Sequence, residues 1–122
     1  MDSKKAIAAL AALAQETRLD VFRLLVRAGP GGLTAGAISQ RLSVPGATMS
    51  FHLKELKNAR VVHCRRETRS LIYSPDFAVM NALLEFLTEH CCEETSCRTC
   101  PDPINPVQPQ GGTNAPATGS QR

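Results

Sequence analysis

Four of the chain's five cysteines lie between residues 91 and 100, in the stretch HCCEETSCRTC that begins at His90. Cys91 and Cys92 are adjacent, and four residues separate them from Cys97, a spacing that lets three sulfurs turn toward one point. Three converging thiolates suit a soft, thiophilic ion of low coordination number. Trivalent arsenic or antimony fits best, since a lone pair occupies its fourth direction. We therefore expect a metal or metalloid site at Cys91, Cys92 and Cys97.

Other interpretations of the cysteine cluster stay open. Zinc prefers four ligands in a tetrahedron, and Cys100 or His90 could complete one. Cys97 and Cys100 match the C-x-x-C spacing of thiol enzymes or metal carriers, but no alternation of strands and helices surrounds them. The neighbouring acidic residues are expected to raise the pKa of the thiols, which disfavours a thiolate kept ready for redox chemistry. The isolated Cys64 is expected to be a small, half-buried hydrophobe.

A second candidate surface lies on the segment GATMSFHLKEL, Gly46 to Leu56. Met49, Leu53 and Leu56 recur at i, i+4 and i+7, which predicts one apolar stripe of a helix. The opposite arc carries small polar groups, one aromatic and a lysine, which suit base edges and phosphates: Ala47, Ser50, Phe51, Lys54 and Asn58, with Thr48 and His52 on its flank. We interpret this segment as a DNA recognition helix. His52 could meet phosphate or pack and bond locally.

A charged hairpin is predicted next. Val61 to Cys64 and Ser70 to Tyr73 are short segments rich in β-formers, joined by residues 65–69, RRETR. Three arginines at this tip, Arg65, Arg66 and Arg69, are suited to contact the DNA backbone or minor groove. A solvated turn is the alternative, and the position directly after the recognition helix favours a wing.

Helices must position both surfaces. Lys4 to Ala14 and Gln15 to Ala28 are predicted helices, the second capped by Thr17, and Thr34 caps a short helix before the recognition helix. Their apolar faces are expected at Ile7, Leu10, Ala11 and Ala14, and at Leu19, Phe22, Leu25 and Val26. Helix, short turn and helix is the helix-turn-helix pattern, which gives a mainly α fold with a small β-hairpin.

The last predicted helix opens at Ser74-Pro75-Asp76 and runs to about His90. It has two apolar stripes: Phe77, Met80, Leu84 and Leu87, and beside them Val79, Leu83 and Phe86. A helix this broadly apolar must be covered on two sides. We expect a homodimer through the first and last helices, which also fits a twofold-related DNA site.

Length, composition and charge limit the number of domains and the kinds of partner that the chain can have. A chain of 122 residues supports one domain, and no membrane-spanning run or signal peptide is found, so a cytoplasmic protein is expected. Residues 47–72 carry six bases against two acids, +4, whereas residues 73–102 carry one base against six acids, −5. Half of the molecule is therefore suited to face phosphate. The expected parts are a DNA-binding and dimerisation domain (1–92), a cysteine-containing extension (93–100) and a disordered tail (101–122).

Residues 5–92 resemble the ArsR/SmtB family of metalloregulatory repressors. The resemblance is carried by the helix-turn-helix, by the segment Thr48 to Leu56 and by the wing Arg65 to Tyr73. It implies a homodimeric winged-helix repressor, not an enzyme, that leaves its double-stranded operator when a metal or metalloid ion binds. The family's recognition positions fall on Ala47, Thr48, Ser50, Phe51 and His52.

Departures from the family pattern narrow the expected inducer. The family's arsenic site, a Cys-x-Cys pattern before the recognition helix, reads Thr34 to Ile38 here and has no cysteine. Its zinc site on the last helix keeps Asp76 but has Ala78 and Glu89 where histidines are expected. The cysteine cluster resembles a C-terminal triad of arsenic-responsive members. The expected inducer is As(III), with Sb(III), methylated As(III), cadmium or lead as alternatives.

Overall fold

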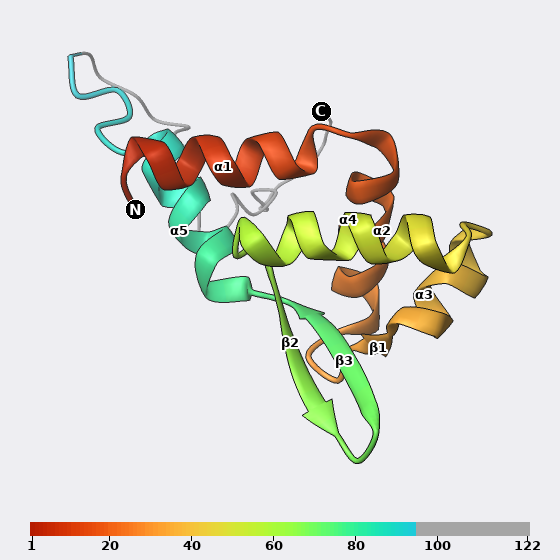
Figure 1. Ribbon diagram of the computed structural model, residues 1–122. Coiled ribbons are helices and arrows are strands. Elements are labelled where there is room, and N and C mark those ends of the chain that lie inside the picture. Colours follow the sequence, from red (N-terminus) through yellow and green to blue (C-terminus); the bar gives the residue numbers. More distant parts are fainter. Residues whose placement is uncertain (95–122) are drawn as a thin grey trace, which may run out of the picture.

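The computed structural model describes residues 1–94. Its elements in chain order are α1 (Ser3–Leu13), α2 (Glu16–Ala28), β1 (Leu33–Thr34), α3 (Ala35–Leu42), α4 (Gly46–Asn58), β2 (Val62–Glu67), β3 (Ser70–Pro75) and α5 (Phe77–Thr88). Figure 1 shows a helical body from which the β2–β3 hairpin projects. This is the winged helix-turn-helix fold that the sequence predicts. The predicted tail, 101–122, lies outside the described residues.

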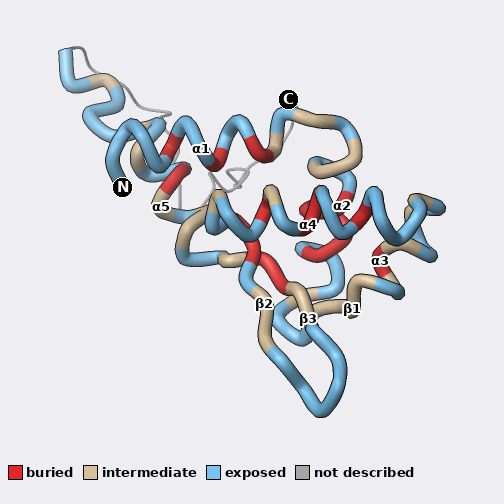
Figure 2. Tube along the Cα trace, in the orientation of Figure 1, coloured by how far each residue is buried: buried red, intermediate tan, exposed pale blue. Residues whose placement is uncertain are grey.

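One hydrophobic core joins the helices. Buried residues come from α1, α2, α3, α4, the start of β2 and α5, and Figure 2 marks their positions along the chain in red. Leu25, Ile38, Met49 and Leu56 are fully buried, and Leu83 contributes from α5. The core is mainly aliphatic, in line with the low aromatic content, with Phe22 as its one buried aromatic residue among residues 1–94, and it fixes α4 against α2 and α3.

The apolar faces predicted for the first two helices agree with the buried faces only in α2, and there only in part. Ala6, Ala9 and Ala12 are the buried residues of α1, whereas Ile7 and Leu10 are exposed. In α2, Val21 and Leu24 join the predicted Phe22 and Leu25 inside, and Leu19 and Val26 are exposed. The hydrophobic periodicity of these helices does not single out the buried face, because both helices carry more apolar residues than one chain buries.

Helix caps follow the sequence in two of three places. The Thr34 hydroxyl accepts from the Ala37 backbone N–H and caps α3 as predicted, and the Asp76 carboxylate accepts from that of Val79 at the predicted start of α5. At α2 the cap is Gln15, which accepts from the Arg18 N–H, so the assignment to Thr17 is wrong.

The small sheet has three strands rather than the predicted two. β1 pairs with β3, and β3 pairs with β2, all antiparallel. Gly32, just before β1, has φ +75, and an added Cβ would lie 2.5 Å from the Tyr73 carbonyl oxygen. Glycine is therefore required where this loop meets β3. β1 escapes a sequence-based reading because it contains only Leu33 and Thr34.

Candidate nucleic-acid interface and cysteine pair

The exposed arc of α4 is the predicted reading surface. Met49, Leu53 and Leu56 are at most 1% exposed and hold the opposite side of the helix, as predicted. Phe51 is 56% exposed, an unusual position for a large aromatic side chain. Four other predicted contacts are also exposed: Ala47, Thr48, Ser50 and Lys54. The geometry leaves these side chains available to a partner.

His52 does not belong to that surface. Its residue is only 8% exposed, and its Nδ1 lies 3.3 Å from Nη1 of Arg18 on α2. The Phe51 and His52 rings form a T-shaped pair, with ring centroids 5.5 Å apart. Of the two alternatives for His52, a phosphate contact or local packing and bonding, its burial and its contact with Arg18 favour the second.

The wing is longer than predicted. β2 continues to Glu67, and β3 ends at Pro75, so Arg65 and Arg66 lie in a strand and only Thr68 and Arg69 form the turn. Thr68 has φ +57, a conformation usually left to glycine. Arg66 and Arg69 are exposed near the tip. Both remain available to phosphate.

Arg65 has different surroundings from the other two wing arginines. Its Nη2 donates to the Gly31 carbonyl at 2.8 Å, its Nη1 reaches the Pro30 carbonyl at 3.4 Å, and its Nε pairs with Glu67 at 3.0 Å. The guanidinium is therefore engaged with the loop that precedes β1. Arg65 anchors the wing to the body, a role that differs from the predicted backbone contact.

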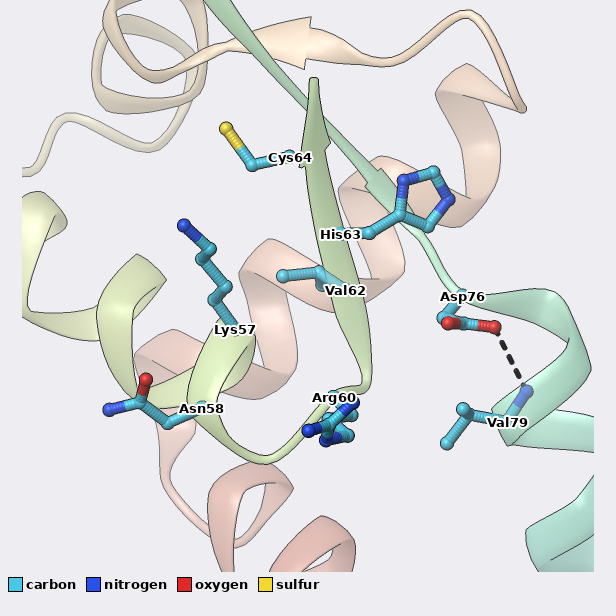
Figure 3. A pocket seen from close by; sticks show the side chains of 8 residues that line it. All are labelled: Lys57, Asn58, Arg60, Val62, His63, Cys64, Asp76 and Val79. Carbon is cyan, nitrogen blue, oxygen red and sulfur yellow. Dashed lines mark hydrogen bonds between the residues drawn. The ribbon is translucent and has the colours of Figure 1, made fainter. Parts of the chain in front are cut away.

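A cleft of about 480 Å³ lies where α4, β2 and the start of α5 meet. Figure 3 shows Lys57 and Asn58 on one side of β2 and Asp76 on the other, with Arg60 between them. Lys57 continues the exposed arc of α4 one turn beyond Lys54. Lys57 is not among the residues predicted to contact DNA, although its spacing of three residues from Lys54 places it on the same arc.

The cysteine pair follows α5 directly. The helix ends at Thr88, two residues earlier than predicted, and the Sγ atoms of Cys91 and Cys92 lie 3.5 Å apart in the following turn. Next to them, His90 Nδ1 contacts a carboxylate oxygen of Glu93. Within the part of the chain that the structure describes, two thiols therefore come together. Cys97 and Cys100 lie outside it.

Thiol chemistry differs between the pair and the isolated cysteine. Desolvation, then the hydrogen bond and charge of the Cys91 thiol, raises the pKa of Cys92, so the cause is not the acidic residues that the sequence suggested. Cys64 is half-buried in β2, as predicted. Burial, followed by the charge and hydrogen bond of Cys64, raises the pKa of Tyr73. Cys64 and Tyr73 are paired across the β2–β3 ladder.

Two absences hold for residues 1–94. No three His, Cys, Asp or Glu side chains in this range gather as a metal would require. No helix in it is long and apolar enough to cross a membrane. The predicted three-cysteine site includes Cys97 and so is not covered by the first statement.

Comparisons with known proteins agree with the geometry. Residues 13–65 match a family model described as a helix-turn-helix domain. The transcriptional activator HlyU of Vibrio cholerae is 29% identical over 92 residues, which cover 75% of this chain and 82% of HlyU. A structure of reduced HlyU from the same organism has a TM-score of 0.56 at 30% identity, over 74% of this chain and 92% of that one.

Two further structures share the fold. An ArsR-like transcriptional regulator from Rhodococcus sp. RHA1 has a TM-score of 0.66 at 24% identity, covering 75% of this chain and 83% of that one. A homodimeric winged helix-turn-helix DNA-binding domain from Mycobacterium bovis has a TM-score of 0.58 at 24% identity, covering 78% and 88%. The ArsR-like structures therefore share the fold of this chain, and through its 30% identity to HlyU the chain belongs to the HlyU family of helix-turn-helix transcriptional regulators.

Proposed function

We propose that this chain is a transcriptional repressor that trivalent arsenic releases from its operator, bound by Cys91, Cys92 and Cys97. The observation that carries the proposal is the 3.5 Å separation of the Cys91 and Cys92 sulfurs. One atom bonded to both sulfurs can span this distance. Cys97, five residues after Cys92, supplies the third thiol in the proposal. Soft thiolate ligands favour thiophilic ions over calcium or magnesium.

The proposed ligand exchange balances without an external base. Arsenite in neutral water is As(OH)3. Each As–S bond forms as one thiol proton leaves with one hydroxide as water, and the oxidation state of arsenic does not change. Because the protonated thiol is the reactant in this net exchange, the raised pKa of Cys92 is no obstacle.

DNA binding would use the exposed arc of α4 and the wing tip. α4 would enter the major groove, where Phe51 has no hydrogen-bonding group and is suited to contact a thymine methyl. Arg66 and Arg69, both exposed, would contact backbone phosphates. Lys54 and Lys57 would contribute further positive charge along α4.

A homodimer through α1 and α5 completes the proposal. Ile7 and Leu10 on α1, and Leu84 and Leu87 on α5, are between 40% and 65% exposed in the single chain. A second copy would cover these side chains and place two recognition helices on a twofold-related site. The related domain from Mycobacterium bovis is homodimeric, which supports this arrangement.

The test is fluorescence anisotropy on a labelled duplex from upstream of the protein's own gene, at fixed salt. Arsenite, cadmium and zinc are added separately. We expect micromolar arsenite to release the protein, Cys91→Ser to abolish release, and Cys64→Ser, a control at the isolated cysteine, to leave release intact. Tight binding that no ion disturbs would remove the sensor and keep the regulator. In a reporter assay, deletion of the gene should raise expression, and a fall would indicate an activator.

A second candidate inducer is methylated As(III). It already carries one carbon ligand, so two thiols suffice, and the structure brings together two, Cys91 and Cys92. Comparing Cys97→Ser with Cys92→Ser separates the two inducers. A methylated species should still release the Cys97→Ser protein from DNA. Inorganic arsenite, or Sb(III) at the same site, should release neither variant from DNA.

A further inference from the structure

Arg18 bonds to two other helices from its place in the first turn of α2. Its Nε donates to the Ala12 carbonyl near the end of α1 at 2.6 Å. Its Nη1 donates to Nδ1 of His52 in the middle of α4 at 3.3 Å. The bond requires the His52 proton to sit on Nε2. One guanidinium therefore joins the helix proposed for dimerisation to the helix proposed for reading DNA.

Other contacts of α1 with α4 are small. The buried side chains of α1 are three alanines, and a hollow of about 330 Å³ remains between the two helices, lined by Ala8, Ala11, Ala12, Glu55, Asn58 and Arg18 itself. The last turn of α1 has no basic residue, and its final carbonyls need donors. Arg18 supplies both a donor and a positive charge there.

The contacts that hold α4 in the body are of a different kind. Met49, Leu53 and Leu56 are fully or almost fully buried in the core that α4 shares with α2 and α3. Loss of the Arg18 bonds would therefore leave α4 seated in its own protomer. What would change is the position of α1 relative to α4.

We propose that Arg18, acting through His52 and the Ala12 carbonyl, is a positioning residue that sets the orientation of α1 relative to the recognition helix. In the dimer of the proposed function, on which this inference rests, that orientation fixes the spacing of the two recognition helices. Spacing matters only when both helices bind one duplex, because the second contact is then intramolecular and depends on geometry.

The experiment compares two labelled duplexes by anisotropy. One is the upstream operator duplex, and the other is the same duplex with one of its twofold-related arms scrambled. The variants are Arg18→Met, which keeps the stem without the donors, and His52→Leu, which removes the acceptor. His52→Asn, which keeps an acceptor at the δ position, is the conservative variant. Arg23→Met, at an exposed position of the same helix, is the control.

We expect Arg18→Met and His52→Leu each to weaken operator binding about tenfold, with binding to the scrambled duplex within twofold of wild type. The double variant should be no weaker than Arg18→Met alone, because Arg18→Met already removes the bond to His52 that His52→Leu removes. His52→Asn and Arg23→Met should bind like wild type. A merely structural role would instead lower binding to both duplexes together.

Several outcomes would overturn the inference. If the wild type binds the operator and Arg18→Met binds it equally tightly, the positioning role is refuted and the proposed function stands. Failure of the wild type itself to bind would refute the proposed function instead. If Arg18→Met does not fold, Arg18→Lys is used instead. Lysine keeps the positive charge, but its single ammonium group cannot donate to both acceptors as the guanidinium does. Operator binding by Arg18→Lys equal to wild type would then reject the inference.

Discussion

Glutamine substitutions at two neighbouring wing arginines, Arg65 and Arg66, should affect different properties: protein stability in the first case and DNA binding in the second. Arg66 is exposed, whereas the Arg65 guanidinium is engaged by the Gly31 and Pro30 carbonyls and by Glu67. Arg66→Gln should therefore weaken DNA binding at unchanged stability. Arg65→Gln should lower stability with a smaller effect on the phosphate contacts.

The size of the Arg66 effect follows from counterion release. Each phosphate contact contributes about 0.9 to the slope of log K against log salt, so a dimer that loses two contacts loses about 1.8. If Arg66→Gln and wild type bind equally at 1 M salt, this difference in slope makes Arg66→Gln bind roughly 30-fold more weakly than wild type at about 0.15 M salt. The loss should be the same on specific and unrelated DNA, because phosphates carry no sequence information.

The size of the Arg65 effect follows from its lost bonds. The 2.8 Å bond to Gly31 contributes about 1 kcal/mol, and the exposed Glu67 pair adds a fraction of that. A loss of about 1 to 2 kcal/mol lowers the Tm of a domain this size by about 5 to 12 °C.

Anisotropy over a salt series and thermal unfolding at fixed protein concentration measure both effects, with Arg69→Gln as a second tip variant. A slope change in Arg65→Gln equal to that in Arg66→Gln, at unchanged Tm, would refute the anchoring role.

Two other predictions concern the β1 loop and the thiols. Gly32→Ala should lower the free energy of unfolding by more than about 2 kcal/mol, since φ at Gly32 is +75 and the added Cβ would meet the Tyr73 carbonyl. Gly36→Ala, with open space at its Cβ, should raise the free energy of unfolding by up to about 1 kcal/mol. Urea unfolding measures both variants, and equal effects would contradict the contact at Gly32. Cadmium must displace the proton of each thiol that binds it, including Cys92, whose pKa is raised. Cadmium affinity should therefore rise about tenfold per pH unit for each thiol proton displaced between pH 6.5 and 8, whereas arsenite affinity should stay flat because each proton leaves in water. A cadmium affinity independent of pH in titration calorimetry would mean that Cys92 is already a thiolate.

The recognition helix was predictable because its two arcs differ so strongly in residue type. Met49, Leu53 and Leu56 have no other use than a core, and the exposed arc around Phe51 has little use in one. For α1 the same pattern does not show which face the core buries. Ile7 and Leu10 are better core residues than alanine, yet the chain buries Ala6 and Ala9 instead. Hydrophobic periodicity identifies apolar faces but does not say which face meets the same chain.

Long-range polar contacts explain the remaining errors. His52 is directed inward toward an arginine 34 positions earlier, and Arg65 bonds backbone carbonyls 34 and 35 positions earlier. Backbone acceptors exist at every position, so no residue pattern marks them. Charged residues near a DNA-binding surface are therefore easily assigned to DNA when they in fact hold the surface in place.

The proposed sensor and the proposed reading surface are connected by α1. α5, which precedes the cysteine pair, contacts α1, and Leu83 is buried in the same core as Ala6 and Ala9. A tenfold release from DNA needs a coupling free energy of only about 1.4 kcal/mol. The two Arg18 bonds, at about 1 kcal/mol each, are of that size. Ligation at the end of α5 therefore needs to break no apolar contact of the core. A shift of α1 that costs both Arg18 bonds in the DNA-bound geometry would be enough. The buried face of α1 is made of alanines, so such a shift should cost less than a movement of α4 itself.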